Sequence, residues 1–236
     1  MWEATIDGRT LHFHLAGINN QNFIMRDEET GSWWQQVSGE AILGPLKGRK
    51  LTRVPMDEIS FALWKRELAR GRVLRPDPRF AKLYAKADWE AGIAKLPVAT
   101  RISDKRLDLR ELVVGIVANG HAKAYRMIDV QQQKPIIDTV GGVPIVIVAD
   151  GQSVRAFSRT VDSKPVDLFA RPDTASITLV DSATGSEWDF AGRAIRGSRA
   201  GRQLQRIEVQ RDYWFDWRAY HPDTAIFNVG LMKRAS

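Results

Sequence analysis

The chain has 236 residues, of which 44% are hydrophobic and 27% charged, and its formal net charge is +7. This composition suits one large or two small folded domains and argues against global disorder. Because there are no cysteines, disulfides, thiolate metal sites and cysteine nucleophiles are excluded. No stretch approaches the ~20 apolar residues of a membrane span, and the first six residues lack the pattern of a signal peptide.

The first part of the chain predicts a small antiparallel sheet. Apolar and polar residues alternate over 10–16, so Leu11, Phe13 and Leu15 should share one face while His12 and His14 share the other. Asp7-Gly8 indicates a hairpin turn before this strand. A helix is expected to open at Pro55, with a last strand at Val73-Leu74. The further expected strands are 2–6, 23–25, 33–37 and 51–54.

Residues 76–111 read as a connector with weak helical character over 79–94. The second part should begin with two hairpins whose turns are Asn119-Gly120 and Gly141-Gly142. The strand 143–149 is almost wholly apolar, as a strand covered on both faces would be. The remaining expected elements are strands at 113–118, 122–125, 136–140, 166–169 and 177–180, and a helix at 213–220.

One segment of the chain repeats. Asp27–Trp34 reads DEETGSWW, and Asp181–Trp188 reads DSATGSEW. The similarity continues from 39–53 into 192–206, and Trp64 matches Trp217 in the same register. Such self-similarity indicates two copies of one structural unit. The sequence therefore predicts a β-rich α+β fold of two related antiparallel-sheet units, each closed by a Trp-bearing helix.

The predicted organisation is a first repeat unit at 1–75, a connector at 76–111 and a second, more complete unit at 112–236. About fifty residues of strands and hairpins precede the second copy, and no counterpart precedes the first. Either these hairpins serve both copies or the reading frame is cut short at its start, in which case the longer protein would be exported or membrane-attached.

In the repeated turn, Asp27 and Asp181 should cap backbone amides, with Thr30 and Thr184 bonding back to them. Gly31 and Gly185 should supply a positive φ angle. These residues are interpreted as structural.

Several motifs together resemble a known family. They are the repeated turn, 39–48, Asn119-Gly120 through Tyr125, the segment 138–144 (DTVGGVP), Trp217 and 221–224 (HPDT). The chain resembles the domain of unknown function 3179 family over most of both halves. The resemblance implies a Cys-x-x-Cys after the Gly-Gly-x-Pro strand, where this chain has Ala149–Ser153 instead. Thiol or metal chemistry is therefore not expected of this chain, and no cofactor or metal is predicted.

A small-ligand cleft is predicted in the first repeat unit. His12 and His14 share a strand face, where they could bind a metal with Asp27 or Glu28, or simply form a solvated polar face. The amides around Asn20 form a turn or a ligand loop. Trp33 would be the exposed member of its pair, either as a stacking wall or as cover for a sheet edge. The predicted cleft comprises His12, His14, Asn20, Trp33, Gln35 and Glu40.

The densest basic stretch contains Arg193, Arg196, Arg199, Arg202 and Arg206, which could form a solvated face or a weak anion-binding one. Phosphate loops, dinucleotide fingerprints and hydrolase signatures are missing. The function favoured by the sequence is a non-catalytic binding or scaffold module. The alternative is a fragment of a metal- or thiol-dependent enzyme or redox protein. There is no specific nucleic-acid signal.

Overall fold

The computed structural model describes residues 1–19, 21–172 and 177–228. The chain forms two compact units. The N-terminal unit comprises residues 1–56 and 98–104, and the C-terminal unit comprises 57–97 and the chain from 105 onward. Antiparallel sheets dominate both units and helices are few and short, which confirms the β-rich fold class. None of the helices in the described ranges is both long and apolar enough to cross a membrane.

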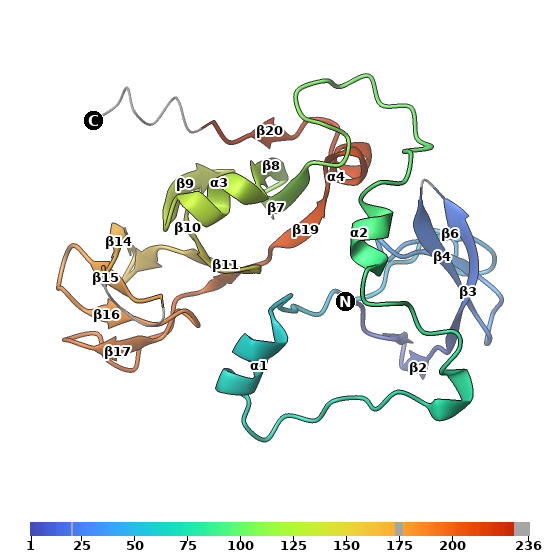
Figure 1. Ribbon diagram of the computed structural model, residues 1–236, viewed down its shortest axis with the longest axis horizontal. Coiled ribbons are helices and arrows are strands. Elements are labelled where there is room, and N and C mark those ends of the chain that lie inside the picture. The colour runs from blue at the N-terminus through green and yellow to red at the C-terminus, as the bar shows by residue number, and fades with distance from the viewer. Residues whose placement is uncertain (20, 173–176, 229–236) are drawn as a thin grey trace. The chain divides into compact units, whose positions relative to one another are not determined.

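The N-terminal unit is a short hairpin followed by a four-stranded meander in the order β3-β4-β5-β6 (Figure 1). Its core is formed by Leu11, Trp34, Ala41 and Leu51, and Met25 packs against them. The strands are β1 (Thr5–Ile6), β2 (Arg9–Thr10), β3 (Phe13–Asn19), β4 (Asn22–Asp27), β5 (Trp33–Gln35) and β6 (Ala41–Leu43).

The predicted inward face of β3 is only partly covered. Leu11 is buried and Phe13 packs edge-on against Trp34, with ring centroids 5.9 Å apart. Leu15, in contrast, is 60% exposed. The register between β3 and β4 shifts at residues 15–17, so the alternation is interrupted there by a bulge.

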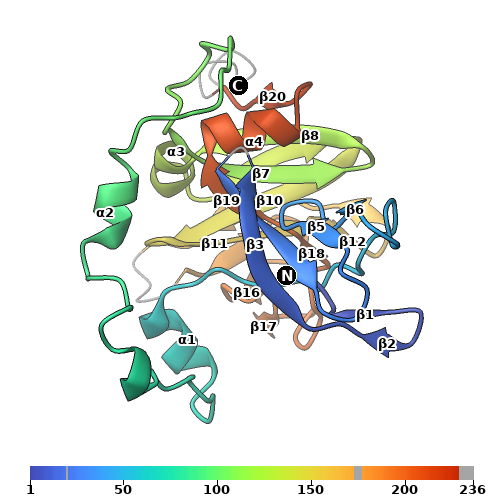
Figure 2. The same cartoon turned by 90° about the vertical axis from the view of Figure 1, so that its right-hand side faces the viewer.

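Two sheets of the C-terminal unit pack face to face, with strand orders β19-β7-β8-β20 and β18-β11-β10-β9 (Figures 1 and 2). Both enclose one apolar core, to which α3 also contributes Met127 and Val130. The elements are β7 (Leu112–Ala118), β8 (His121–Arg126), α3 (Met127–Gln132), β9 (Ile136–Val140), β10 (Val143–Asp150), β11 (Ser153–Ser158), β18 (Arg206–Ile207), β19 (Gln210–Tyr213) and β20 (Ala225–Ile226).

A third sheet covers the other side of β10. Ile145 and Ile147 of β10 face the first core, whereas Val146 and Val148 face a second core with Leu168, Leu179 and Trp188. Both faces of β10 are therefore buried, as its apolar sequence predicts. The strands on this side are β12 (Thr160–Val161), β13 (Lys164–Pro165), β14 (Leu168–Ala170), β15 (Leu179–Asp181), β16 (Glu187–Trp188) and β17 (Ala194–Arg196).

The predicted helix at 213–220 is confirmed as α4 (Trp214–Tyr220), which packs Trp214 and Trp217 against Val113 and Ala124. The helix expected from Pro55 instead begins six residues later, as α1 (Phe61–Glu67), because the Ser60 hydroxyl accepts from the Leu63 N–H and caps it there. The connector contains η1 (Pro78–Phe80) and α2 (Trp89–Ile93).

Two predicted strands are wrong. Val73 and Leu74 form no strand, and both are exposed. Within 51–54, only Arg53 makes an isolated bridge, to Trp2. By its contacts, the segment 57–75 belongs to the C-terminal unit. The boundaries 1–75, 76–111 and 112–236 describe sequence similarity, and they stay a prediction.

Candidate functional site

Three segments far apart in the sequence line one cavity at an end of the β19-β7-β8-β20 sheet. The cavity has a volume of about 460 Å³. Its walls are the start of β8 with the turn before it, the end of β9 with its turn, and the turn that follows α4. In residue numbers these segments are 120–123, 139–141 and 220–225.

Local turn chemistry brings the first two segments together. Asn119 and Gly120 have φ angles of 47° and 77°, which fit the tight hairpin turn that this dipeptide favours. Gly141 also has a positive φ, of 53°, and a Cβ there would collide with the Ala118 carbonyl. The Asn119 side chain donates to the Gly141 carbonyl at 2.9 Å, so the two hairpin turns are joined directly.

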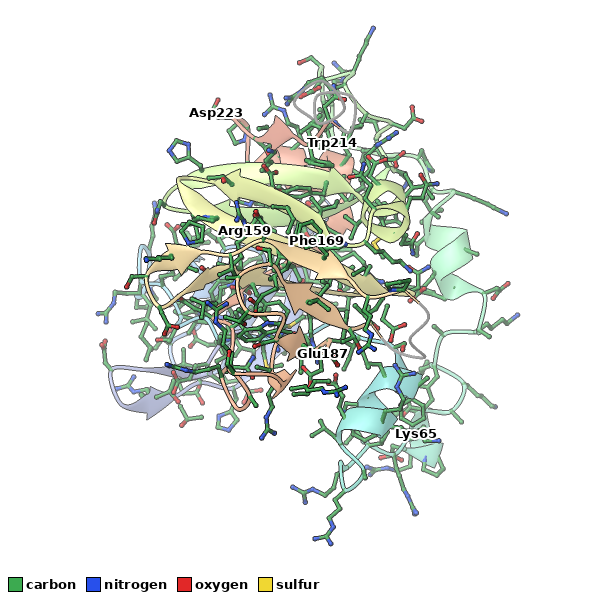
Figure 3. All side chains as sticks on the ribbon, turned by 90° about the vertical axis from the view of Figure 1, so that its left-hand side faces the viewer. Lys65, Arg159, Phe169, Glu187, Trp214 and Asp223 are labelled. Carbon is green, nitrogen blue, oxygen red and sulfur yellow. The ribbon has the colours of Figure 1, made fainter. Side chains whose placement is uncertain are left out.

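The third wall is held by Trp217 of α4. Its indole Nε1 donates to the Thr224 hydroxyl at 2.9 Å, and its ring lies 4.0 Å from the His221 imidazole, centroid to centroid. The Thr224 N–H donates to the His221 carbonyl at 3.1 Å, which closes the turn. Asp223, labelled in Figure 3, lies on this turn at the rim of the cavity.

Lys123 is the half-buried cation of the cavity. Its Nζ lies 2.6 Å from Asp138 Oδ2, and it also lies over the rings of Tyr125 and Phe227. The same carboxylate accepts from the Tyr125 hydroxyl and from the Thr139 N–H, both at 2.7 Å. Asp138 is thus held by three donors, and it fixes the ammonium of Lys123 in place.

The cluster of Lys123, Tyr125 and Asp138 can bind a charged group but is poorly suited to proton transfer. Burial, followed by the negative charge of Asp138 and its hydrogen bond, raises the pKa of Tyr125 far above its ordinary value, so its phenol stays neutral. The Asp138 carboxylate is occupied by its donors. The ammonium of Lys123, the imidazole of His121 and the carboxylate of Asp223 are the groups that line the cavity and can meet a ligand.

Three of the predicted cleft residues, His14, Trp33 and Gln35, lie on the β3-β4-β5-β6 sheet. The register pairs His14 with Arg26 and Arg26 with Trp33, which places the three in one row across the sheet. Gln35 lies two residues further along β5, opposite Ile24, and accepts from the Ser38 hydroxyl at 3.0 Å. Glu40 is exposed, and its backbone forms an isolated β-bridge with the backbone of Lys50. Asn20 lies outside the described residues.

His12 is paired with Glu29. The ring Nδ1 of His12 lies 2.6 Å from one carboxylate oxygen of Glu29, and the backbone N–H of His12 donates to the other oxygen at 2.9 Å. The hydrogen bond and the charge of Glu29 raise the pKa of His12, and the same bonds lower the pKa of Glu29. Within the described ranges no three histidine or acidic side chains are grouped as a metal site.

The proposed third ligand Asp27 serves a different purpose. It is fully buried and accepts from Trp34 Nε1 at 2.7 Å and from the Thr30 N–H and hydroxyl. Asp181 makes the same bonds to Trp188 and Thr184, at 3.1 Å to the indole. Gly31 and Gly185 follow these threonines with φ angles of 72° and 67°. Each turn is therefore organised by one buried carboxylate.

Most arginines of the basic stretch are paired with acids. Arg199 lies 3.2 Å from Asp181, Arg202 lies 3.3 Å from Asp162 and Arg196 lies 3.8 Å from Glu187. Arg206 forms an ion pair with Asp57. Anion binding through Arg193 and its neighbours stays a prediction.

Comparison with known proteins identifies the family. The family model described as "Protein of unknown function (DUF3179)" matches residues 1–224. The chain therefore belongs to this family, as its motifs indicate. No curated protein and no solved structure matched the chain.

A signal for the cavity is present in the sequence, although residue chemistry alone does not reveal it. The segments Asn119–Tyr125, 138–144 and 221–224 are each family motifs, and nothing in their sequences gives them a common purpose. Lys123 and Asp138 lie on different strands, so their 2.6 Å pairing cannot be read from spacing. The clue that the sequence offered was the resemblance of all three segments to one family, and the structure shows that they converge.

Proposed function

We propose that the protein is a non-catalytic binding module whose small polar ligand occupies the cavity of the C-terminal unit. One observation carries this proposal: three family motifs, separated by up to about a hundred residues, line the same 460 Å³ cavity. That volume lies within the range of small-molecule sites, roughly 300–1,000 Å³. Turn residues with a purely structural role are not expected to line a common cavity.

The ligand's chemistry follows from the open groups. The ammonium of Lys123 keeps donors beyond the one used by Asp138, so the ligand should offer a carboxylate, phosphoryl or hydroxyl oxygen to it. Asp223 and the imidazole of His121 can receive donors from the ligand's other end. Because Asp138 already accepts from three donors and Tyr125 is held neutral, binding rather than acid–base catalysis fits the cluster.

Thermal denaturation of the full chain with a panel of small carboxylates, sugars and nucleotides tests the proposal. A ligand that raises the Tm of the wild type should raise it much less in Lys123→Gln, since a bound ligand stabilises by mass action. Asp138 keeps its bonds from Tyr125 and Thr139, so this variant should fold. Lys164→Gln, at an exposed position on β13, is the matched control. Equal shifts in both variants would place the ligand elsewhere.

A second candidate location is the cleft predicted around His12, His14, Asn20, Trp33, Gln35 and Glu40. It is supported by the row that His14, Arg26 and Trp33 form across the sheet. An aromatic ring beside a cation and an imidazole can hold a planar polar ligand. In the same panel, a shift that survives Lys123→Gln and is lost in Trp33→Ala would favour this face.

We also propose that the two halves are related copies, each followed by a Trp-bearing helix. Helix α4 packs on its own half, whereas α1 packs on the C-terminal unit and does not close the first half. Helices α1 and α4 are both seven residues long, and their C-terminal N–H groups donate to the carbonyls of Trp64 and Trp217. Arg53 lies over the ring of Trp2, and Arg206 lies over the ring of Phe157 in the equivalent place. Removal of the repeated Asp–Trp hydrogen bond from each half in turn provides the test.

A further inference from the structure

Nearly all of the excess positive charge lies in one short segment. Residues 65–86 contain eight basic and two acidic residues, a net of +6 in a chain whose total is +7. Both acids are already engaged, Glu67 by Arg155 at 2.6 Å and Asp77 by Arg79 at 2.6 Å. The basic residues are Lys65, Arg66, Arg70, Arg72, Arg75, Arg79, Lys82 and Lys86.

Most of these cations face solvent alone. Arg66 pairs with Asp150 at 2.7 Å. Within the described part of the chain, Arg70, Arg72, Arg75, Lys82 and Lys86 have no acidic side chain at ion-pair distance, and all five are exposed. Lys65, labelled in Figure 3, is an exposed cation on α1. The segment therefore presents uncompensated positive charge.

The same segment exposes large apolar side chains between its cations. Leu74 is 94% exposed and Leu83 is 80% exposed. A soluble surface rarely displays so many apolar side chains in one stretch unless they contact something. The exposed apolar residues from α1 to α2 are Phe61, Leu68, Val73, Leu74, Phe80, Leu83, Tyr84 and Trp89.

One end of this segment is anchored firmly to the C-terminal unit. Leu63 is buried in the second core, and the Ser60 N–H donates to the Ser153 hydroxyl at 2.9 Å. Arg155, only 3% exposed, donates to both oxygens of Glu67 and to Asp57. The buried Leu63 and the ion pairs of Arg155 therefore hold α1 against the C-terminal unit, with its other face exposed.

We propose that residues 61–89 dock the protein on the surface of an anionic lipid bilayer. The cations would lie among the lipid headgroups while the leucines and aromatic rings enter the boundary of the acyl chains. A nucleic acid could contact the cations and the aromatic rings. The exposed aliphatic side chains of Val73, Leu74 and Leu83, however, can neither bind phosphates nor stack on bases as aromatic rings do. Combined basic and aliphatic exposure therefore favours lipid.

Sedimentation of the full-length protein with vesicles tests this surface. Binding is expected to phosphatidylcholine vesicles that contain phosphatidylserine, and much less to phosphatidylcholine alone. It should weaken as the ionic strength rises, because screening shortens the reach of the surface charge. Each basic residue near such a surface contributes about fivefold in affinity.

Two pairs of substitutions separate charge from apolar contact. Arg72→Gln with Arg75→Gln should weaken binding about 30-fold. Leu74→Ser with Leu83→Ser should weaken it at least about tenfold, since each leucine loses its burial in the acyl boundary. All four side chains are exposed, so the fold should be unaffected. Lys47→Gln with Lys164→Gln removes the same charge from exposed positions elsewhere and should leave binding unchanged.

Three results would overturn the proposal. The first is no binding to the anionic vesicles at low salt. The second is equal weakening by the Lys47 and Lys164 control pair, which would make the attraction a matter of net charge alone. The third is loss of vesicle binding only in the charge variant, together with tight binding to single-stranded RNA, which would assign the segment to nucleic acid.

Discussion

At the scale of single residues, one hydrogen bond recurs in both halves of the chain. Asp27 and Asp181 are buried carboxylates, 0% and 1% exposed, and each accepts from the indole of a fully buried tryptophan seven residues later. Burial would raise the pKa of each aspartate, but the hydrogen bonds from the indole and from the threonine outweigh it, so each pKa is lowered. The folded state therefore favours the ionised carboxylate.

Asp27→Ala and Asp181→Ala should each lower the free energy of unfolding by about 1–3 kcal/mol, because the buried indole N–H loses its acceptor. Chemical denaturation at neutral pH measures this loss. Since the folded pKa values are lowered, the stabilisation is present above the unfolded pKa and is lost as the pH falls through the folded one. Both variants should thus be less sensitive to acid than the wild type.

Asp88→Ala is the control for these variants, because Asp88 is exposed and its side chain makes no capping bond. Similar losses in the two buried variants support the proposed relation between the two halves. A loss in only one of them would show that the repeated sequence does not carry a repeated structural role.

Asp212 behaves in the opposite way. Burial, followed by the negative charge of Asp216, raises the pKa of Asp212 to about 8. A carboxyl whose folded pKa is raised is stabilising below the unfolded pKa, and that contribution is lost as the pH rises through the folded value. Asp212→Asn should therefore stabilise the protein increasingly between about pH 4 and 8, with a constant gain above that range.

Denaturation of Asp212→Asn and wild type at several pH values measures this gain, with exposed Asp88→Asn as the matched control. The amide introduced at position 212 cannot ionise, so the repulsion from Asp216 disappears at high pH. A gain that does not vary with pH would mean that Asp212 is already ionised in the folded protein at neutral pH.

At the scale of elements, local signals predicted the hairpins and failed where a partner was needed. Asn119-Gly120 and Gly141-Gly142 fix their turns by backbone chemistry, and the four flanking strands are confirmed within one or two residues. Val73-Leu74 has the composition of a strand but no neighbour to pair with, so it stays exposed. Propensity describes a residue and its neighbours in sequence, and a strand also needs a partner.

The candidate site shows the same limit. Polar residues close in sequence, such as His12 and His14, are easily noticed, yet His12 is occupied by Glu29. Lys123 and Asp138 do not stand out in the sequence, because their pairing depends on the sheet and on two turns joined by the Asn119 side chain. Motif similarity located the right segments, and the fold was needed to bring them together.

The contact between α4 and β7 depends on a missing side chain. A Cβ at Gly115 would overlap the ring of Trp217. Gly115→Ala should therefore lower the free energy of unfolding by about 1–3 kcal/mol through overpacking, and should also disturb the turn at Thr224 that Trp217 holds. Urea denaturation gives the first effect, and weaker ligand stabilisation in the cavity gives the second.

Gly92→Ala is the natural control, because Gly92 lies within α2 and a Cβ there meets no atom within 4 Å. That change should be neutral or stabilising by up to about 1 kcal/mol. If Gly115→Ala were equally harmless, Trp217 would have room to move and could not hold the wall of the cavity.

At the scale of the whole molecule, regular secondary structure and excess positive charge lie in different parts of the chain. The sheets of both units bury their apolar side chains, whereas residues 68–88 contain only η1 and include five exposed cations that form no ion pair with any described residue. Proteases cleave where the backbone can leave the fold without breaking buried contacts. The protein should therefore have one region of high sensitivity to a protease specific for lysine and arginine.

Limited digestion with trypsin should cut first after Arg70, Arg72, Lys82 or Lys86, all of which are exposed and outside strands. Arg155 lies in β11 and is 3% exposed, so cleavage there requires unfolding of the sheet and should come much later. Mass spectrometry of the first fragments identifies the bonds. Early cuts after Arg193 or Arg199 would contradict the expectation, because they would show that the turns held by Asp181 open more readily than the segment between α1 and α2.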